Sequence, residues 1–270
     1  MMVSSVSILC MAVSALLSIS LPVALLIVLR KKYGAKIVPA MVGAAAFVVF
    51  GLVLERLTRL LVLQPTANGS TWMSGNQYVF YNLIATCVFE ETARFLSFKL
   101  LRKRYAGILT ALSYGVGHGG IKVILLGGAS TIASIVMSVA ANAGKFEGKY
   151  DLLTFVDLLS TASTPSAMFL VTGVEHLFTL AAHLALSVIV FYSVYENRRL
   201  WLYPAAILLH ALINAPMALA QVGVLTNGFW TDALAFLLPA ALVLIAVYTH
   251  RKLKPAEIPV IEDGNADEKV

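Results

Sequence analysis

Charged residues are scarce in this sequence. They make up 13% of the 270 residues, against roughly 25% in ordinary soluble domains, whereas 59% of the residues are hydrophobic. Cysteine is also rare, because only Cys10 and Cys87 are present and both lie inside apolar runs. These shortages exclude a soluble enzyme, a disordered chain and a disulfide scaffold. Long apolar runs separated by short basic groups instead predict an all-α, polytopic membrane protein built as a bundle of transmembrane helices.

The N-terminal end has no basic residue before its first apolar run, residues 3–29, and Arg30, Lys31 and Lys32 follow that run. A secretory signal peptide has the opposite order of charge and a shorter apolar core. We therefore expect a retained first span whose N-terminus lies outside. The net charge of +6 does not indicate a nucleic-acid partner, because Lys and Arg stand in small groups at the ends of apolar runs, where they orient membrane spans.

Seven spans account for the apolar runs and for the positions of the basic groups. They lie near residues 3–29, 37–63, 78–101, 106–144, 166–196, 200–225 and 231–249. The basic groups at 30–36, 102–104, 198–199 and 251–254 then all face the cytoplasm, as the positive-inside rule requires. The sequence thus predicts one helical membrane domain over residues 1–250 and a polar, disordered cytoplasmic tail over residues 251–270.

One expected span is too long for a bilayer. As a continuous helix, residues 106–144 would extend about 58 Å at 1.5 Å per residue, nearly twice the thickness of the hydrocarbon core. Glycine occurs at positions 115, 117, 119, 120, 127 and 128 within it. We expect this segment to bend, break or re-enter the membrane, and non-helical backbone at that depth has to be buried or to line a wet cavity.

Ionisable side chains inside apolar spans are costly and usually mark a functional site. Counted from the cytoplasmic end of each span, four of them come to one depth near the middle of the bilayer. They are Glu90 at about 17 Å, His118 at about 18 Å, His183 at about 20 Å and His210 at about 15 Å. Four residues from four spans at one level predict a shared buried site, although His183 is equally compatible with a packing role.

Helical spacing separates the two carboxylates of this site. Glu90 and Glu91 are adjacent and therefore point about 100° apart, and Arg94 is spaced to pair with either of them. A purely structural Glu–Arg pair is the alternative, but it leaves the second carboxylate and the histidines without a role. On a later span, His210 and Asn214 lie one turn apart on a single helical face.

Three other polar residues fall near the membrane boundaries. Glu175 and His176 come out at about 30 Å by the same rule, so we expect them at the outer interface or in support of the site. His250 lies beside Arg251 at the inner boundary, where we expect contact with lipid headgroups.

At these residues the chain resembles the glutamate-dependent intramembrane proteases, which include the CAAX prenyl protease and bacteriocin-processing (CPBP) superfamily and the PrsW-like proteases. Three motifs carry the resemblance, in order and within residues 78–216: Glu90-Glu91-Thr-Ala-Arg94, Tyr114-x-x-x-His118 and His210-x-x-x-Asn214. Within this group the chain is similar to the YhfC-like branch of bacterial membrane peptidases, which has the same Glu-Glu-x-x-Arg, Gly-x-Gly-His-Gly-Gly and late His motifs. It departs from the superfamily pattern in having two residues, not three, before Arg94, and Tyr114 where Phe is usual.

The resemblance implies an integral protein of the bacterial plasma membrane that cleaves a membrane-embedded or lipid-anchored polypeptide. It also implies roles for individual residues. Glu90 would be the general base and Glu91 would support it. The remaining catalytic residues would be His118, His210 and Asn214. Arg94 and His183 would have supporting roles, and His183 has a counterpart only in the PrsW-like pattern.

The chemistry that fits these residues is hydrolysis of a peptide bond. Glu90 would activate a water, and the histidines and Asn214 would stabilise the oxyanion. Alternatively His118, His183 and His210 would bind zinc or another divalent metal, although the sequence lacks the His-Glu-x-x-His spacing. Two other functions remain open on the sequence alone: a proton-coupled transporter that uses the same Glu/His residues, and a non-catalytic membrane scaffold. Neither the substrate nor the oligomeric state can be read from the residues.

Overall fold

The computed structural model describes residues 2–64, 73–145, 152–196 and 199–253, and this part of the chain forms helices and no strand. Within these residues, six helices are long and apolar enough to cross a membrane. Four of them are α1 (Ser5–Tyr33), α8 (Ser166–Tyr195), α9 (Leu202–Gln221) and α10 (Gly228–Lys252). The fifth, Ile37–Leu63, comprises α2 (Ile37–Ala46), η1 (Phe47–Leu54) and α3 (Glu55–Leu63). The sixth, Ile108–Asn142, comprises α5 (Ile108–Lys122), η2 (Val123–Ala129) and α6 (Ser130–Asn142). The prediction of an all-α integral membrane protein is therefore confirmed.

Helix α4 (Gly75–Leu101) corresponds to the expected span at residues 78–101, which is not among these six. Its 27 residues are enough to cross a bilayer, but its polar and charged residues make it less apolar than the other six. It begins with a capping box, in which the Ser74 backbone N–H donates to Gln77 Oε1 at 2.9 Å and the Gln77 backbone N–H donates to Ser74 Oγ at 3.4 Å. Because α4 packs against α2, α8 and α9, its residues Glu90, Glu91 and Arg94 are buried in protein instead of facing lipid.

The long segment expected to bend, break or re-enter the membrane is continuous helix. It runs from α5 through η2, where the hydrogen bonding changes to the π pattern, into α6, and no loop interrupts residues 108–142. Its glycines serve close packing: a Cβ at Gly127 would lie 2.7 Å from the His176 ring of α8, and one at Gly128 would lie 2.6 Å from Ile19 of α1. The expected break is therefore only a change of helix type.

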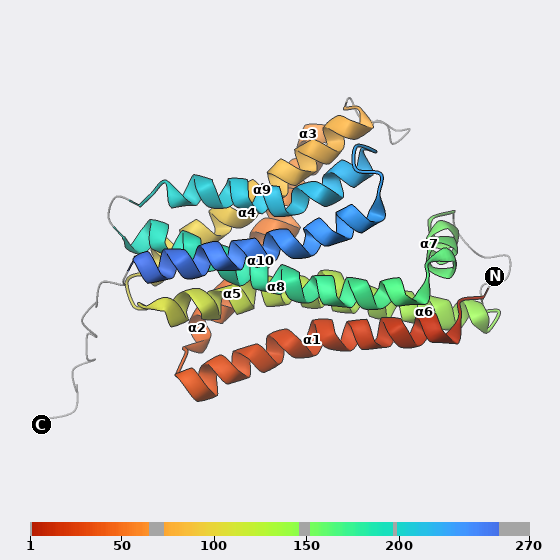
Figure 1. Cartoon of the computed structure of the whole chain (residues 1–270), viewed down its shortest axis with the longest axis horizontal. Helices are drawn as coiled ribbons and strands as arrows, with labels where there is room; N and C mark the ends of the chain where they lie inside the picture. Colours follow the sequence, from red (N-terminus) through yellow and green to blue (C-terminus); the bar gives the residue numbers. More distant parts are fainter. Residues whose placement is uncertain (1, 65–72, 146–151, 197–198, 254–270) are drawn as a thin grey trace, which may run out of the picture.

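A short helix, α7 (Leu152–Ser163), lies in a region expected to be a loop. Its 12 residues are too few to span a bilayer. Figure 1 shows α7 set off from the other helices, beside the end of α6 and the beginning of α8.

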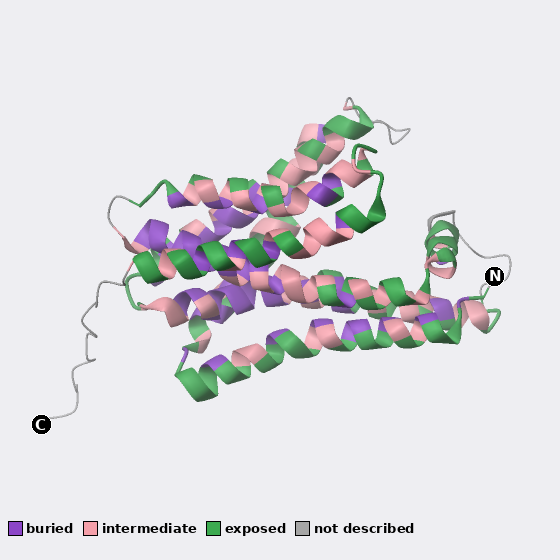
Figure 2. Ribbon diagram, viewed as in Figure 1, coloured by how far each residue is buried: buried purple, intermediate pink, exposed green. Residues whose placement is uncertain are grey.

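Helix α8 is at the centre of the bundle and contacts α1, α4, α5, α9 and α10. In the apolar 18-residue stretch of α8, 72% is buried inside the protein, against 22–28% in the corresponding stretches of the five other candidate spans. Figure 2 shows that the buried residues gather where α4, α5 and α8 lie together. A polar side chain on the inner face of α8 is therefore removed from both lipid and water.

Basic groups predicted to face one side of the membrane lie at helix ends on one side of the bundle. Helices α1 and α10 end, and α5 begins, at one end of the bundle, while α1 begins at the other (Figure 1). Basic residues occupy the last turns of α1 and α10. Which end faces the cytoplasm stays a prediction, and the expected tail lies outside the described residues beyond position 253.

Candidate functional site

The two adjacent carboxylates of α4 have different surroundings. Glu91 Oε1 forms a buried ion pair with Arg94 Nη1 and lies 2.7 Å from His210 Nδ1 of α9. Its other oxygen, Oε2, is buried and has no hydrogen-bond partner within the described chain. The choice that helical spacing left open is thereby settled in the structure, because Arg94 pairs with Glu91.

The negative charge of Glu90 is balanced by a lysine of helix α5, Lys122. Its Oε1 accepts a hydrogen bond of 2.8 Å from Lys122 Nζ. Its Oε2 lies 3.3 Å from His118 Nε2 and 3.8 Å from His183 Nδ1 of α8. The Glu90 side chain is 2% exposed, and among its described partners His118, His183 and Lys122 only Lys122, at 17%, reaches the surface.

Arg94 links α4 to α8. Its Nε donates to Ser187 Oγ at 3.1 Å, and its Nη2 lies 3.0 Å from His183 Nδ1. Since a guanidinium can only donate, His183 Nδ1 accepts this bond and a neutral ring has its proton on Nε2. Ser187 Oγ in turn donates to the His183 carbonyl at 2.7 Å. One arginine thus fixes the position of both Glu91 and the His183 ring.

His118 is enclosed by aromatic side chains. Its Nδ1 lies 3.3 Å from the Tyr114 hydroxyl one turn earlier on α5, and the Phe47 ring of η1 meets it edge-on at a centroid distance of 5.5 Å. The His183 ring is also 5.5 Å away, and His210 follows at 5.3 Å from His183. The structure therefore brings together the four residues that the sequence placed at one depth.

The glycines around His118 allow the helices to approach closely. A Cβ at Gly117 would lie 1.9 Å from the Ala40 carbonyl oxygen of α2, and a Cβ at Gly119 would lie 2.5 Å from His183 Cβ. Distances under 3 Å between such atoms are not tolerated, so any other residue would push the helices apart. Gly119 in particular lets His183 reach the level of His118.

One group of side chains has a donor set that suits a metal. Glu90, His118 and His183 each offer one ligand atom, and these atoms lie within 4.8 Å of one another. Two ligand atoms bound to a tetrahedral zinc at about 2.1 Å are about 3.4 Å apart. The 3.3 Å between Glu90 Oε2 and His118 Nε2 fits this separation, and the 3.8 Å between Glu90 Oε2 and His183 Nδ1 is longer. A metal at His183 Nδ1 also requires Arg94 Nη2 to turn away, because both use one lone pair.

Two expected members lie outside this group of three. His210, which the sequence suggested as a metal ligand, has its Nδ1 on Glu91. Asn214 donates from Nδ2 to the His210 carbonyl at 3.2 Å, and neither Glu90 nor Glu91 hydrogen-bonds with it. Both residues flank the site on α9 without contacting Glu90.

The polar residues predicted near the outer surface are separate from the site. His176 Nδ1 lies 2.8 Å from Ser18 Oγ of α1, and Glu175 is half-buried on the same helix turn of α8. Sequence reasoning also missed two members of the site, Lys122 and Ser187. Both lie four residues after a predicted member, His118 and His183 respectively, and that spacing on a helix is the signal that identifies them.

Comparison with known proteins agrees with this geometry. A family model described as YhfC intramembrane metalloprotease matches residues 17–235. The chain belongs to this family. The matched stretch contains α4, α5, α8 and α9, and therefore every residue of the site. The uncharacterized membrane protein YhfC of Bacillus subtilis (strain 168) is 33% identical over 258 residues, which are 93% of this chain and 99% of the relative. No solved structure gives a significant match.

Family membership confirms the resemblance to the YhfC-like branch, while the wider relationship to the CPBP and PrsW-like proteases stays a prediction. The name of the family indicates a membrane protease that uses a metal, and the buried Glu90, His118 and His183 are compatible with metal binding. A Bacillus relative is consistent with the bacterial plasma membrane.

Proposed function

We propose that the protein is a metal-dependent intramembrane endopeptidase that hydrolyses a peptide bond of a membrane-associated polypeptide. The observation that carries this proposal is the buried group of Glu90, His118 and His183, which stands beside a second carboxylate, Glu91, inside a membrane bundle. Two nitrogen ligands and one carboxylate oxygen are a common ligand set of catalytic zinc. Membership of an intramembrane metalloprotease family supports hydrolysis over proton-coupled transport.

The three residues of this group would hold the metal. A bound divalent ion would polarise the scissile carbonyl and make a water nucleophilic at neutral pH. Lys122 holds the Glu90 oxygen that faces away from the two histidines, and this fixes Oε2 toward them. The carboxylate is then already oriented before any ligand arrives.

The second carboxylate supplies the base. Arg94 and His210 both engage Glu91 Oε1, so Oε2 is the oxygen left to take a proton from water and return it to the leaving amine. Asn214 donates one amide N–H to the His210 carbonyl, and its side chain also lies within hydrogen-bonding distance of the Cys87 thiol. The amide N–H that meets this weak acceptor would turn to the developing oxyanion. The roles of the two glutamates differ here from those expected from the resemblance, in which Glu90 is the base.

Two matched variants distinguish these assignments. Glu90→Gln and Glu91→Gln each remove one charge and keep the shape of the side chain. With Glu91 as base, E91Q retains bound metal and loses cleavage of a membrane-inserted reporter at least about 100-fold, whereas E90Q loses both metal and cleavage. The measurements are metal content of the purified protein and reporter cleavage in proteoliposomes. Glu175→Gln, outside the site, keeps both and serves as the control.

Other outcomes have definite meanings. If E90Q retains the metal but not cleavage, while E91Q cleaves, then Glu90 is the base. If the wild-type protein binds no divalent metal and a chelator leaves cleavage unchanged, the metal-dependent mechanism is wrong and glutamate-activated water without a metal takes its place. Uptake of a solute that depends on Glu90, with no cleavage of any reporter, would contradict the protease assignment itself.

A further inference from the structure

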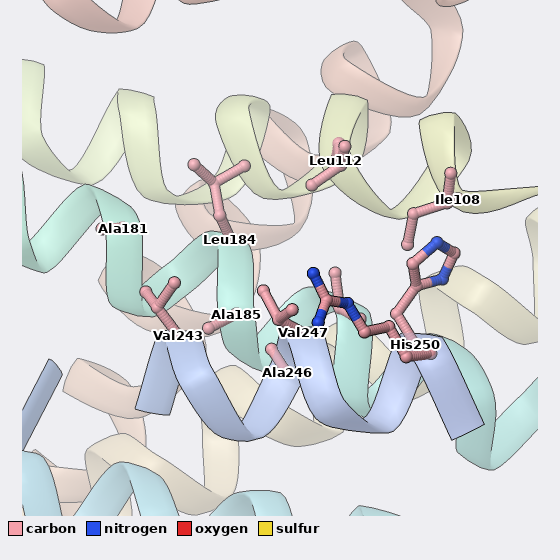
Figure 3. A pocket seen from close by; sticks show the side chains of 11 residues that line it. Ile108, Leu112, Ala181, Leu184, Ala185, Val243, Ala246, Val247 and His250 are labelled. Atoms are coloured by element: carbon pink, nitrogen blue, oxygen red, sulfur yellow. The ribbon is translucent and has the colours of Figure 1, made fainter. Parts of the chain in front are cut away.

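A groove of about 360 Å³ lies between α5, α8 and α10, and none of its lining residues belongs to the Glu/His site (Figure 3). Nine of the eleven lining residues are aliphatic: Ile108, Leu112, Ala181, Leu184, Ala185, Val188, Val243, Ala246 and Val247. The other two are His250 and Arg251. Cavities that take small ligands begin at about 300 Å³, so the groove is large enough for part of an elongated apolar molecule.

Small side chains make the groove, and it reaches the membrane-facing surface. Ala181 and Ala185 on α8 and Ala246 on α10 place single methyl groups where the helices face each other. Val247 at the rim is 42% exposed. Because α8 and α10 are both candidate spans, this rim faces the bilayer, and a hydrocarbon chain can enter from the side.

The two polar lining residues, His250 and Arg251, are adjacent in the last turn of α10. Figure 3 shows His250 beside Ile108 at one end of the groove, with Ala181 and Val243 at the other. His250 Nδ1 is held 2.6 Å from the Tyr192 hydroxyl. Arg251 is exposed and makes no ion pair within the described part of the chain. The groove thus combines an apolar wall with a cation, Arg251, that no described carboxylate compensates.

An anionic lipid has the matching distribution of polarity and charge. Its acyl chain would cover the aliphatic wall, and its phosphate would meet a guanidinium, which binds phosphate through parallel hydrogen bonds. The last turn of α10 is basic and falls on the predicted cytoplasmic side, where anionic lipids concentrate. A zwitterionic lipid fills the wall equally well but leaves the charge of Arg251 less well balanced.

We propose that the groove between α5, α8 and α10 binds one anionic phospholipid, with an acyl chain along the aliphatic wall and the phosphate at Arg251 and His250. The site is independent of the proposed peptidase chemistry. Its occupant packs against α5 and α8 on faces other than those that hold His118 and His183, because Leu112 and Leu184 line the groove.

Native mass spectrometry of the delipidated protein tests the proposal. Phosphatidylglycerol and phosphatidylcholine with identical acyl chains are titrated separately. We expect one phosphatidylglycerol to bind with clear preference, and Arg251→Ala to weaken it about fivefold, the effect of one basic residue at a lipid surface. Lys252→Ala, the adjacent exposed cation that does not line the groove, should change the affinity less than about twofold.

A second pair of variants tests the apolar wall. Val247→Trp fills the rim and should abolish retention of the lipid, whereas Leu244→Trp, at a residue of α10 that is 71% exposed and outside the groove, should not. Both positions are exposed, so we expect both variants to fold.

Four results would overturn the proposal. They are equal retention of the two lipids, equal losses in R251A and K252A, displacement of the lipid by inorganic phosphate alone, and tighter retention of a fatty-acylated peptide than of phosphatidylglycerol. The last result would make the groove a site for a lipidated polypeptide.

Discussion

The ion pair between Lys122 and Glu90 predicts how stability depends on a bound metal. In Lys122→Met the buried carboxylate loses its cation, and breaking a buried pair by removing one partner costs about 3–5 kcal/mol. Glu90 keeps its contact with His118, and the Lys122 side chain is 17% exposed. We therefore expect the lower end of that range, about 3 kcal/mol, which lowers the melting temperature by about 6 °C or more.

A divalent cation should reverse this loss. An ion bound by Glu90, His118 and His183 would compensate the same carboxylate from its other oxygen, so zinc should raise the melting temperature of K122M by more than that of the wild type. The assay is thermal unfolding in detergent, followed by tryptophan fluorescence, with a chelator or with added zinc. Lys99→Met is the matched control, since Lys99 is an exposed residue of α4 whose ammonium lies 4.5 Å from the Phe95 ring centroid.

The reasoning is refuted if K122M in chelator is as stable as the wild type, or if K99M loses as much stability. Either result would mean that Glu90 does not depend on Lys122 for its charge balance. A K122M protein that is destabilised but unaffected by zinc would retain the ion-pair argument and contradict the metal site.

Two further variants address the packing and the hydrogen bonds of the site. Gly119→Ala places a methyl group 2.5 Å from His183 Cβ. It should cost about 1–3 kcal/mol of stability by overpacking and weaken zinc binding at least tenfold, whereas Gly228→Ala, with open space around it, should change neither quantity. Equal zinc affinity of G119A and wild type in isothermal titration would contradict the role of this glycine. Ser187→Ala removes the acceptor of Arg94 Nε and leaves a buried donor unpaired, so thermal unfolding should show a loss of about 1–3 kcal/mol, and an unchanged midpoint would mean that another group takes the bond.

Most spans could be predicted from hydropathy because the bilayer leaves few alternatives. Residues 37–63 and 166–196 were expected as spans, and the structure has Ile37–Leu63 and Ser166–Tyr195. In lipid only a continuous helix satisfies the backbone of such a segment. Helix α7 escaped prediction because 12 residues are too few to span, and apolar content does not separate a short helix from a loop.

The site residues were recognisable because ionisable groups are rare in apolar spans, but their partners were not. Arg94 is three residues from Glu91 and four from Glu90, and both spacings allow an ion pair. The structure has Arg94 on Glu91, and Lys122 of α5 lies on Glu90 instead. The choice depends on how α5 and α8 are placed beside α4, because Lys122 of α5 reaches Glu90 and α8 holds Arg94 through Ser187 and His183. A single sequence does not contain this arrangement.

Glu55 and Arg59 show where the rule about charged residues in spans predicts too much. Glu55 is buried within the span Ile37–Leu63 and pairs with Arg59 one turn later on α3. Neither contacts the Glu/His site among the bonds of the described chain. Glu55 and Arg59 therefore compensate each other locally, whereas the site gathers ionisable groups from α4, α5, α8 and α9 around Glu90 and Glu91.

The burial of the site has a consequence for turnover. Each of Glu90, Glu91, Arg94, His118, His183 and His210 is at most 2% exposed, so a peptide reaches them only in a state in which the helices have separated. The observed affinity for a substrate is then the intrinsic affinity multiplied by the population of that state, and an open fraction of about 1% weakens binding about 100-fold. Substitutions far from the site that change this population would alter KM, even though they touch none of the reacting groups.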